Sequence, residues 1–246
     1  DAAWRMRETA DQPGYGALLQ RELGYTPLQL RYNSGRHISD NGRELAALLE
    51  RLHDAWPTPI DEIALIGHSM GGLVARSACH YGHAEGHRWT QAVRHVVCLG
   101  SPHLGAPLEK GINALGWALA NLPETRPLAR AVNARSAGIK DLRFGACIEE
   151  DWCDCDPDEL LTDRCQDVPC LPGATFYFIA ATISRGERDP LGTVVGDLLV
   201  RVPSASGAGR RRRVPFAKVR RLGGLTHFDL LNHPAVYDQI RAWLAR

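Results

Sequence analysis

Residues 63–75 of the chain read Ile63-Ala64-Leu65-Ile66-Gly67-His68-Ser69-Met70-Gly71-Gly72-Leu73-Val74-Ala75. The short apolar run at the start predicts a buried strand, and the small-residue segment from about Gly72 to Tyr81 predicts a helix. Between them lies Gly67-x-Ser69-x-Gly71, the pattern of a nucleophile elbow, in which a tight strand-to-helix turn lifts a serine hydroxyl above the sheet edge. The glycines on either side of Ser69 let strand and helix pass closely around a strained backbone. The stretch therefore predicts that Ser69 is a nucleophile.

The turn also places Ser69 at the N-terminal end of a helix, where unpaired N–H groups and the helix dipole favour negative charge. The first of these groups belongs to Met70. We expect the Met70 N–H to be one donor of an oxyanion hole.

A serine hydroxyl becomes a good nucleophile when an imidazole takes its proton and a carboxylate orients that imidazole. In folds with this elbow the chain order is serine, then acid, then histidine. Two of the ten histidines lie far enough along the chain, His227 and His233. His227 stands in a glycine-rich loop after a predicted strand, whereas His233 precedes Pro234 and suits a helix start. We therefore predict His227 as the base.

Three carboxylates are candidates for the acid, namely Glu187, Asp189 and Asp197. Apolar residues flank Asp197, which indicates a partly buried carboxylate that needs a partner such as an imidazole. Glu187 and Asp189 lie among arginines and glycine, as in an exposed turn. Asp197 is the predicted acid.

The composition is typical of soluble globular proteins, with 44% hydrophobic and 23% charged residues in 246. A net charge of +1 gives no general attraction to nucleic acid. No apolar run approaches the ~20 residues that a membrane-spanning helix needs. The compartment is left open between cytoplasmic and exported, as is the oligomeric state.

Predicted strands and helices alternate along the chain, which favours an α/β fold with a mostly parallel sheet and helices on both faces. The expected strands are 28–32, 62–66, 93–99, 173–182 and 216–222, and the expected helices are 4–23, 43–56, 72–81 and 234–245, with a polar loop at 80–89.

The interval from residue 104 to residue 172 breaks this alternation and is too long for a loop. It contains predicted helical segments at 112–122 and 127–132. We interpret residues 1–103 and 173–246 as the two parts of one core domain, and residues 104–172 as an inserted lid.

Five of the seven cysteines fall within 24 residues, namely Cys147, Cys153, Cys155, Cys165 and Cys170. Such clustering is typical of disulfides in an oxidising compartment, but free thiols or a metal site remain alternatives. Against zinc, the segment has no paired C-x-x-C and no histidine. No metal or organic cofactor is predicted.

Four consecutive arginines, Arg210–Arg213, follow a small polar segment. They suit a solvated loop, and a contact with an anionic headgroup or lipid surface is the alternative.

Three stretches carry a resemblance to a known family. They are Gly67–Gly72, Leu99–Pro107 (Leu-Gly-Ser-Pro-His-Leu-Gly-Ala-Pro), and Gly196-Asp197 with Val200 and Pro203–Ala205. With His227 they resemble the α/β-hydrolases of the esterase/lipase kind, near the bacterial relatives of inositol-deacylase-like (PGAP1-like) lipases. The resemblance implies a Ser69-Asp197-His227 triad, with His68 and the Pro102–Gly105 turn lining the site. For His103 in that turn, a structural role in supporting the loop is the alternative.

The family also has a strand ending in a His-Gly pair, whose loop supplies the second oxyanion N–H. No such pair precedes the elbow here. By analogy, the strand belongs upstream of Asp1 and would pair between residues 28–32 and 62–66. We therefore expect a fragment that lacks the first strands and half of the oxyanion hole.

These observations predict a serine hydrolase that cleaves carboxylic esters of lipids or other apolar acyl compounds through an acyl-enzyme. An acyltransferase or a thioesterase would use the same triad. A non-catalytic binding module with this fold is a third reading, because an elbow can persist without activity.

Overall fold

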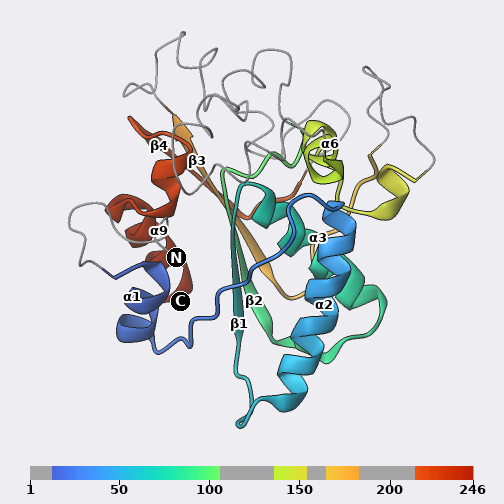
Figure 1. Cartoon of the computed structure of the whole chain (residues 1–246). Helices are drawn as coiled ribbons and strands as arrows, with labels where there is room; N and C mark the ends of the chain where they lie inside the picture. The colour runs from blue at the N-terminus through green and yellow to red at the C-terminus, as the bar shows by residue number, and fades with distance from the viewer. Residues whose placement is uncertain (1–12, 106–135, 154–164, 183–213, 246) are drawn as a thin grey trace.

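The computed structural model describes residues 13–105, 136–153, 165–182 and 214–245, and within them four strands form one parallel sheet in the order β1-β2-β3-β4. The strands are β1 (Ile63–His68), β2 (Val93–Leu99), β3 (Thr175–Thr182) and β4 (Lys218–Gly223). Every neighbouring pair runs parallel. The carboxyl ends of all four strands therefore lie at one edge of the sheet (Figure 1).

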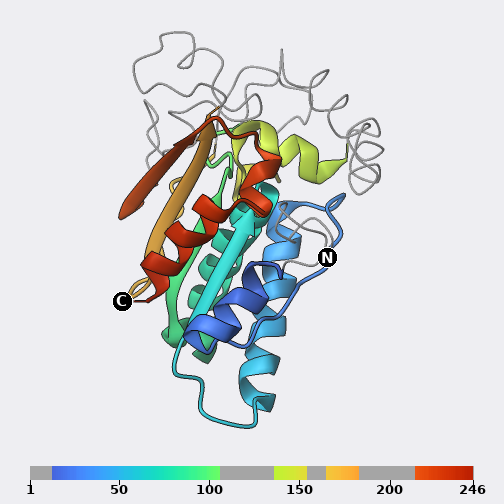
Figure 2. The ribbon, with the colours of Figure 1, turned by 90° about the vertical axis from the view of Figure 1, so that its left-hand side faces the viewer.

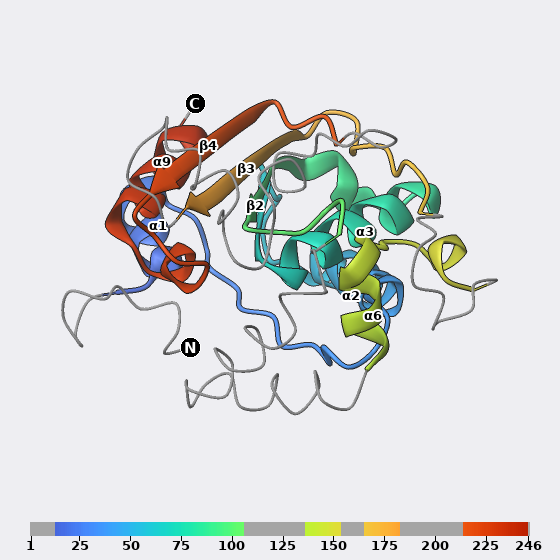
Figure 3. The same ribbon diagram turned by 90° about the horizontal axis from the view of Figure 1, so that it is seen from above.

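Helices cover both faces of this sheet, as Figures 2 and 3 show from two further directions. One face carries α2 and α3, and the other carries α1 and α9. The helices are α1 (Tyr15–Leu23), α2 (Ile38–Ala55), α3 (Met70–Ala84), α6 (Ala137–Phe144) and α9 (Pro234–Leu244), with short 3-10 helices η2 (Arg88–Ala92), η4 (Glu149–Asp151) and η5 (Phe228–Leu231).

Two apolar cores result from the two-residue alternation of the central strands. Val96 and Cys98 of β2 pack toward α2 and α3, whereas Val97 and Leu99 of the same strand pack toward α1 and α9. All four side chains are fully buried. A strand buried on both faces reads as a continuous apolar run, and β2 occupies the predicted residues. The predicted fold class is confirmed.

The helix predicted to begin near Arg43 begins five residues earlier, at Ile38. The reason is a cap from far along the chain, because the carboxylate of Asp141 in α6 accepts the Ile38 N–H at 2.7 Å. This carboxylate takes the place of the local N-cap side chain, and the residue at the cap position, His37, makes no side-chain cap of its own.

The polar loop predicted for residues 80–89 is wrong in its first half. Helix α3 continues to Ala84, and Tyr81 and Gly82 are buried. A methyl group on Gly82 would lie 2.6 Å from the Trp89 ring, so Gly82 lets the end of α3 approach η2 closely. The helix ends where Gly86 adopts a positive φ of 71°, and the N–H groups of Gly86 and His87 donate to the His83 and Gly82 carbonyls.

Residues 28–32 do not form the predicted strand. They pair with no strand of the described sheet, in which β1 and β4 are the two edge strands. Leu28 is 62% exposed and Leu30 43% exposed. The alternation of Leu28, Leu30 and Tyr32 suits a strand, but a strand also needs a hydrogen-bonded neighbour, and no described strand supplies one.

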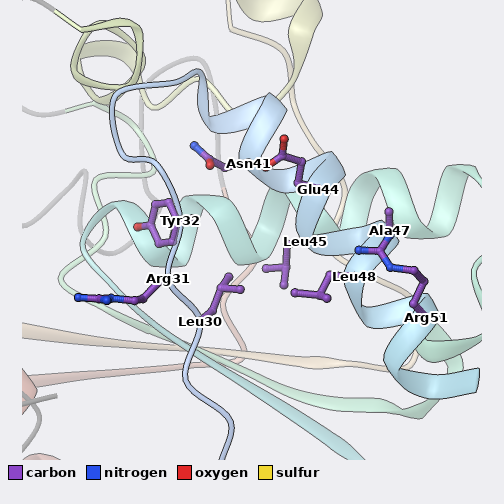
Figure 4. A pocket seen from close by; sticks show the side chains of 9 residues that line it. All are labelled: Leu30, Arg31, Tyr32, Asn41, Glu44, Leu45, Ala47, Leu48 and Arg51. Atoms are coloured by element: carbon purple, nitrogen blue, oxygen red, sulfur yellow. The ribbon is translucent and has the colours of Figure 1, made fainter. Parts of the chain in front are cut away.

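A groove of about 410 Å³ opens between residues 30–32 and α2 (Figure 4). Leucine and charged side chains line it from both sides, and the lining residues are Leu30, Arg31, Tyr32, Asn41, Glu44, Leu45, Ala47, Leu48 and Arg51. At one end, the Tyr32 hydroxyl oxygen would lie 3.8 Å from a methyl group built on Gly71. The groove therefore reaches toward the turn that contains Ser69.

The predicted helical segments at 112–122 and 127–132 lie outside the described residues, as do the four arginines at 210–213. Within the interval 104–172, the described part includes α6 and η4, which lie close to α2 and α3. In the ranges that can be described, no helix combines the length and the apolar character needed to cross a membrane.

Candidate active site

Ser69 has the strained backbone expected of a nucleophile elbow. Its φ is 52° and its ψ is −121°, and among the described residues it is the one non-glycine residue with a positive φ. The Ser69 N–H donates to the Leu99 carbonyl at 2.8 Å, which holds the turn against the end of β2. A non-glycine residue in this region carries a cost of ~1–3 kcal/mol and persists when its surroundings impose it.

The glycines around Ser69 are required by the close approach of strand and helix. A methyl group on Gly67 would lie 2.4 Å from the Gly71 carbonyl carbon. One on Gly72 would lie 2.1 Å from the Ser101 hydroxyl oxygen. Glycine at these positions is thus what lets α3 start directly above the ends of β1 and β2.

Met70 is the first residue of α3, and its side chain is buried. An N–H in the first turn of a helix has no intrahelical acceptor, so the Met70 N–H is available to a ligand at the turn. Its role as an oxyanion donor stays a prediction.

His227 lies at the same edge of the sheet, at the start of η5, and is 6% exposed. Its ring rests on Gly100, the residue after β2, because a methyl group at Gly100 would be 2.8 Å from both Cε1 and Nδ1 of His227. The ring also lies beside that of His68, with 4.5 Å between ring centroids. The structure therefore brings His227 to the residue that precedes Ser69.

A short hydrogen-bonded turn fixes the loop that carries His227. The Thr226 N–H and the Thr226 hydroxyl each donate to Asp229 Oδ2 at 2.7 Å. Asp229 is buried. No role for Thr226 or Asp229 was predicted from the sequence, although the Thr-x-x-Asp spacing is a capping-box signal that points to both.

The side chain of His103 lies in the protein interior rather than on an open surface. Its side chain is fully buried, with ring centroids 5.1 Å from Phe216 and 6.1 Å from Phe178. These contacts fit a residue that supports the loop after β2. A site-lining role for His103 stays a prediction.

The predicted acid, Asp197, lies outside the described residues, as do Glu187 and Asp189. Ser69, Met70, His68 and His227 are brought together at one edge of the sheet, and Asp197 stays a prediction.

The cysteines in the described part form no disulfide with one another. Cys79, Cys98 and Cys147 belong to the core between the sheet and α2 and α3, and the partly buried Cys170 packs against it. Burial raises the pKa of Cys79 to about 12 and also raises the pKa of Cys98. Such thiols behave as small apolar core residues. Among the described residues, no group of three or more His, Cys, Asp or Glu side chains could hold a metal ion.

A family model named PGAP1-like alpha/beta domain matches residues 29–152, half of the chain. The matched part contains the elbow, β1, α3 and β2. The chain belongs to the PGAP1-like α/β domain family. The α/β-hydrolase resemblance that the sequence carried at Ser69 and at residues 99–107 is thereby confirmed.

Solved structures with similarity to this PGAP1-like domain include an esterase and a thioesterase domain. The esterase RhEst1 from Rhodococcus sp. ECU1013 is 16% identical, with 94% of this chain and 85% of that chain covered and a TM-score of 0.48. The NocB thioesterase domain of the nocardicin cluster is 14% identical, with 94% and 89% covered and a TM-score of 0.48. A comparison with curated proteins finds no match.

Proposed function

We propose that this protein is a serine hydrolase that cleaves carboxylic esters of lipids or other apolar acyl compounds. The observation that carries the proposal is the strained Ser69, at a φ of 52°, on the same sheet edge as the buried imidazole of His227. Backbone strain of this kind collects at functional sites, and an elbow serine with a nearby imidazole is the arrangement that acyl transfer needs.

In the proposed reaction, Ser69 Oγ attacks the ester carbonyl carbon while a ring nitrogen of His227 takes the hydroxyl proton. The Met70 N–H donates to the carbonyl oxygen as it becomes negative. His227 then returns the proton to the leaving alkoxide, which leaves an acyl group on Ser69. Water repeats the sequence and releases the carboxylic acid. Asp197 is assigned the role of orienting His227 and stabilising its charged form.

The lid proposed for residues 104–172 is supported by one contact near the nucleophile. A methyl group on Gly138 at the start of α6 would lie 3.3 Å from Met70 Cε, which shows how closely α6 approaches the residue after Ser69. A segment in that position can cover an apolar acyl group. We keep the division into 1–103, 104–172 and 173–246 as a proposal on this basis.

A lipid-surface contact is supported by the charge of β4. Arg220 and Arg221 are exposed, Lys218 is partly exposed, and none of the three forms an ion pair with a described residue. Cations near an anionic lipid surface each contribute ~1 kcal/mol of attraction. Sedimentation with vesicles containing phosphatidylserine, and with neutral phosphatidylcholine vesicles, tests this contact directly.

The decisive experiment for the hydrolase is Ser69→Ala with a matched control, Ser34→Ala, which changes a serine outside the elbow motif. We expect Ser69→Ala to abolish hydrolysis of short-chain p-nitrophenyl esters and labelling by a fluorophosphonate probe, while Ser34→Ala keeps both. Labelling without hydrolysis, with turnover appearing when an alcohol or thiol acceptor is added, would point to an acyltransferase. Equal labelling of the wild type and Ser69→Ala would refute the proposal.

A further inference from the structure

His68 is the variable residue inside Gly67-x-Ser69 and the last residue of β1. Its backbone is fixed by the sheet, because His68 stands opposite Leu99 of β2 in the parallel register. The side chain of this residue is therefore held at a defined place beside the nucleophile. The His68 side chain contacts residues of the loop that carries His227.

The His68 ring makes a polar contact with the backbone of His227. Nε2 of His68 lies 3.0 Å from the His227 carbonyl oxygen. A carbonyl oxygen can only accept a hydrogen bond, so Nε2 carries the proton and His68 is fixed as the Nε2–H tautomer. This bond joins the strand that ends at Ser69 to the loop that carries the predicted base, 159 residues further along the chain.

Aromatic packing adds a second constraint on the same pair. The rings of His68 and His227 lie with their centroids 4.5 Å apart and their planes at 47°. Phe228 closes the group, with its centroid 5.6 Å from that of His227 and 6.4 Å from that of His68. Together with Gly100, these rings leave the imidazole of His227 few orientations.

The charge state of His68 suits a fixed support. Burial, with the charge of His227 as the second cause, lowers the pKa of His68 to about 3. With this lowered pKa the ring is a weaker base than an ordinary imidazole, so it does not compete with His227 for the Ser69 proton. It is also uncharged at neutral pH and does not repel the imidazolium that forms during catalysis.

We propose that His68 is a positioning residue for His227, which holds the loop and the ring of the base in register with Ser69 through its Nε2–H. The inference rests on the proposed hydrolase activity and adds a role for the variable position of the elbow. The test must separate two roles of His68: a hydrogen bond from Nε2–H that orients His227, and a ring that only fills space beside it.

The experiment compares His68→Phe with His68→Gln. Phenylalanine keeps a ring but has no donor, whereas the glutamine amide can place an N–H near the position of Nε2. We expect His68→Phe to lower kcat by about 10- to 100-fold, since a misplacement of ~1 Å at a catalytic group can cost 10²-fold. KM for a p-nitrophenyl ester should stay near the wild-type value, and the rate of fluorophosphonate labelling should fall in parallel with kcat. His68→Gln should recover most of the loss.

His95→Phe is the matched control. His95 is also a strand histidine, on β2, and its Nδ1 contacts the Tyr177 hydroxyl at 3.2 Å near the opposite end of the sheet. Its loss should lower the melting temperature but leave kcat close to the wild-type value. The positioning role is overturned if His68→Gln is as slow as His68→Phe, or if His68→Phe is no slower than His95→Phe. Absence of Ser69-dependent hydrolysis in the wild type would instead refute the proposed function itself.

Discussion

The imidazole of His227 rests directly on the Cα of Gly100, where a single methyl group would stand 2.8 Å from two ring atoms. Such a contact is shorter than carbon and nitrogen atoms tolerate, so the side chain of His227 requires glycine at residue 100. The backbone requires it as well, because φ at Gly100 is +59°.

Gly100→Ala is therefore expected to displace His227 and to lower kcat for ester hydrolysis by about 10²-fold, the effect of a shift of ~1 Å in a catalytic group. Gly173→Ala is the matched control, since Gly173 has a φ of +82° with nothing near enough to meet a methyl group. Both variants place an alanine at a positive φ, but only in Gly100→Ala would the new methyl group contact His227. Similar kcat values for the two variants would show that the contact with His227 has no catalytic consequence.

The pKa of His68 predicts how stability depends on pH. Because its pKa is lowered from 6.5 to about 3 in the folded protein, the unfolded chain binds a proton between these values that the folded chain does not. The contribution of His68 to the free energy of unfolding should thus be full above pH 6.5 and be lost as the pH falls toward 3, by up to about 1.4 kcal/mol per pH unit.

His68→Gln removes this proton and should flatten the dependence of the melting temperature on pH between 6.5 and 4. Some slope should remain, because burial also lowers the pKa values of His80 and His95. Differential scanning fluorimetry across this range measures both curves. Parallel curves for the wild type and His68→Gln would contradict the predicted coupling.

Local sequence patterns were enough to predict strand β2 and the elbow at Ser69, because residues close by in the sequence determine both. Strand β2 is an apolar run between turns, and the elbow follows from glycines spaced around Ser69. Both are decided by contacts within a few residues or by burial on both faces. His227 was found by chain order, and the structure places it beside His68.

What the sequence did not predict depends on contacts between distant residues. The start of α2 depends on Asp141, 103 residues beyond Ile38. Whether residues 28–32 form a strand depends on a hydrogen-bonded neighbour, and the alternation of Leu28 and Leu30 cannot specify that neighbour. The support of His227 by Gly100 is likewise a contact across more than a hundred residues.

Asp141 is expected to contribute strongly to stability. Besides accepting the Ile38 N–H, its carboxylate contacts His37 Nδ1 at 3.1 Å, and the His37 ring stacks on Trp152 at 3.6 Å. Asp141→Ala should lower the free energy of unfolding by about 1–3 kcal/mol, because it leaves a buried N–H without an acceptor. Urea unfolding measures the change.

Two variants make this prediction specific. Asp141→Asn keeps an acceptor oxygen and should lose less than Asp141→Ala. Asp40→Ala removes a carboxylate in the first turn of the same helix. Asp40 Oδ2 lies 3.7 Å from Nη2 of the exposed Arg36, and exposed pairs of this kind contribute ~0–1 kcal/mol. An Asp40→Ala variant as unstable as Asp141→Ala would argue against the capping role.

The exposed leucines beside the edge strand predict self-association. Strand β1 is an apolar run with no described strand on its outer side, and Leu28, Leu30 and Leu48 lie exposed nearby. Open strand edges and contiguous apolar surface both promote aggregation. Leu28→Lys should therefore reduce light scattering in a concentration series while changing the free energy of unfolding by less than ~0.5 kcal/mol, as surface substitutions do.

Leu19→Lys is the control for this prediction. The Leu19 side chain in α1 is only 5% exposed, so this variant should instead destabilise the fold by at least ~2–5 kcal/mol. If Leu28→Lys unfolded as readily as Leu19→Lys, residue 28 would be packed in the folded protein; if scattering stayed unchanged, another surface would drive the association.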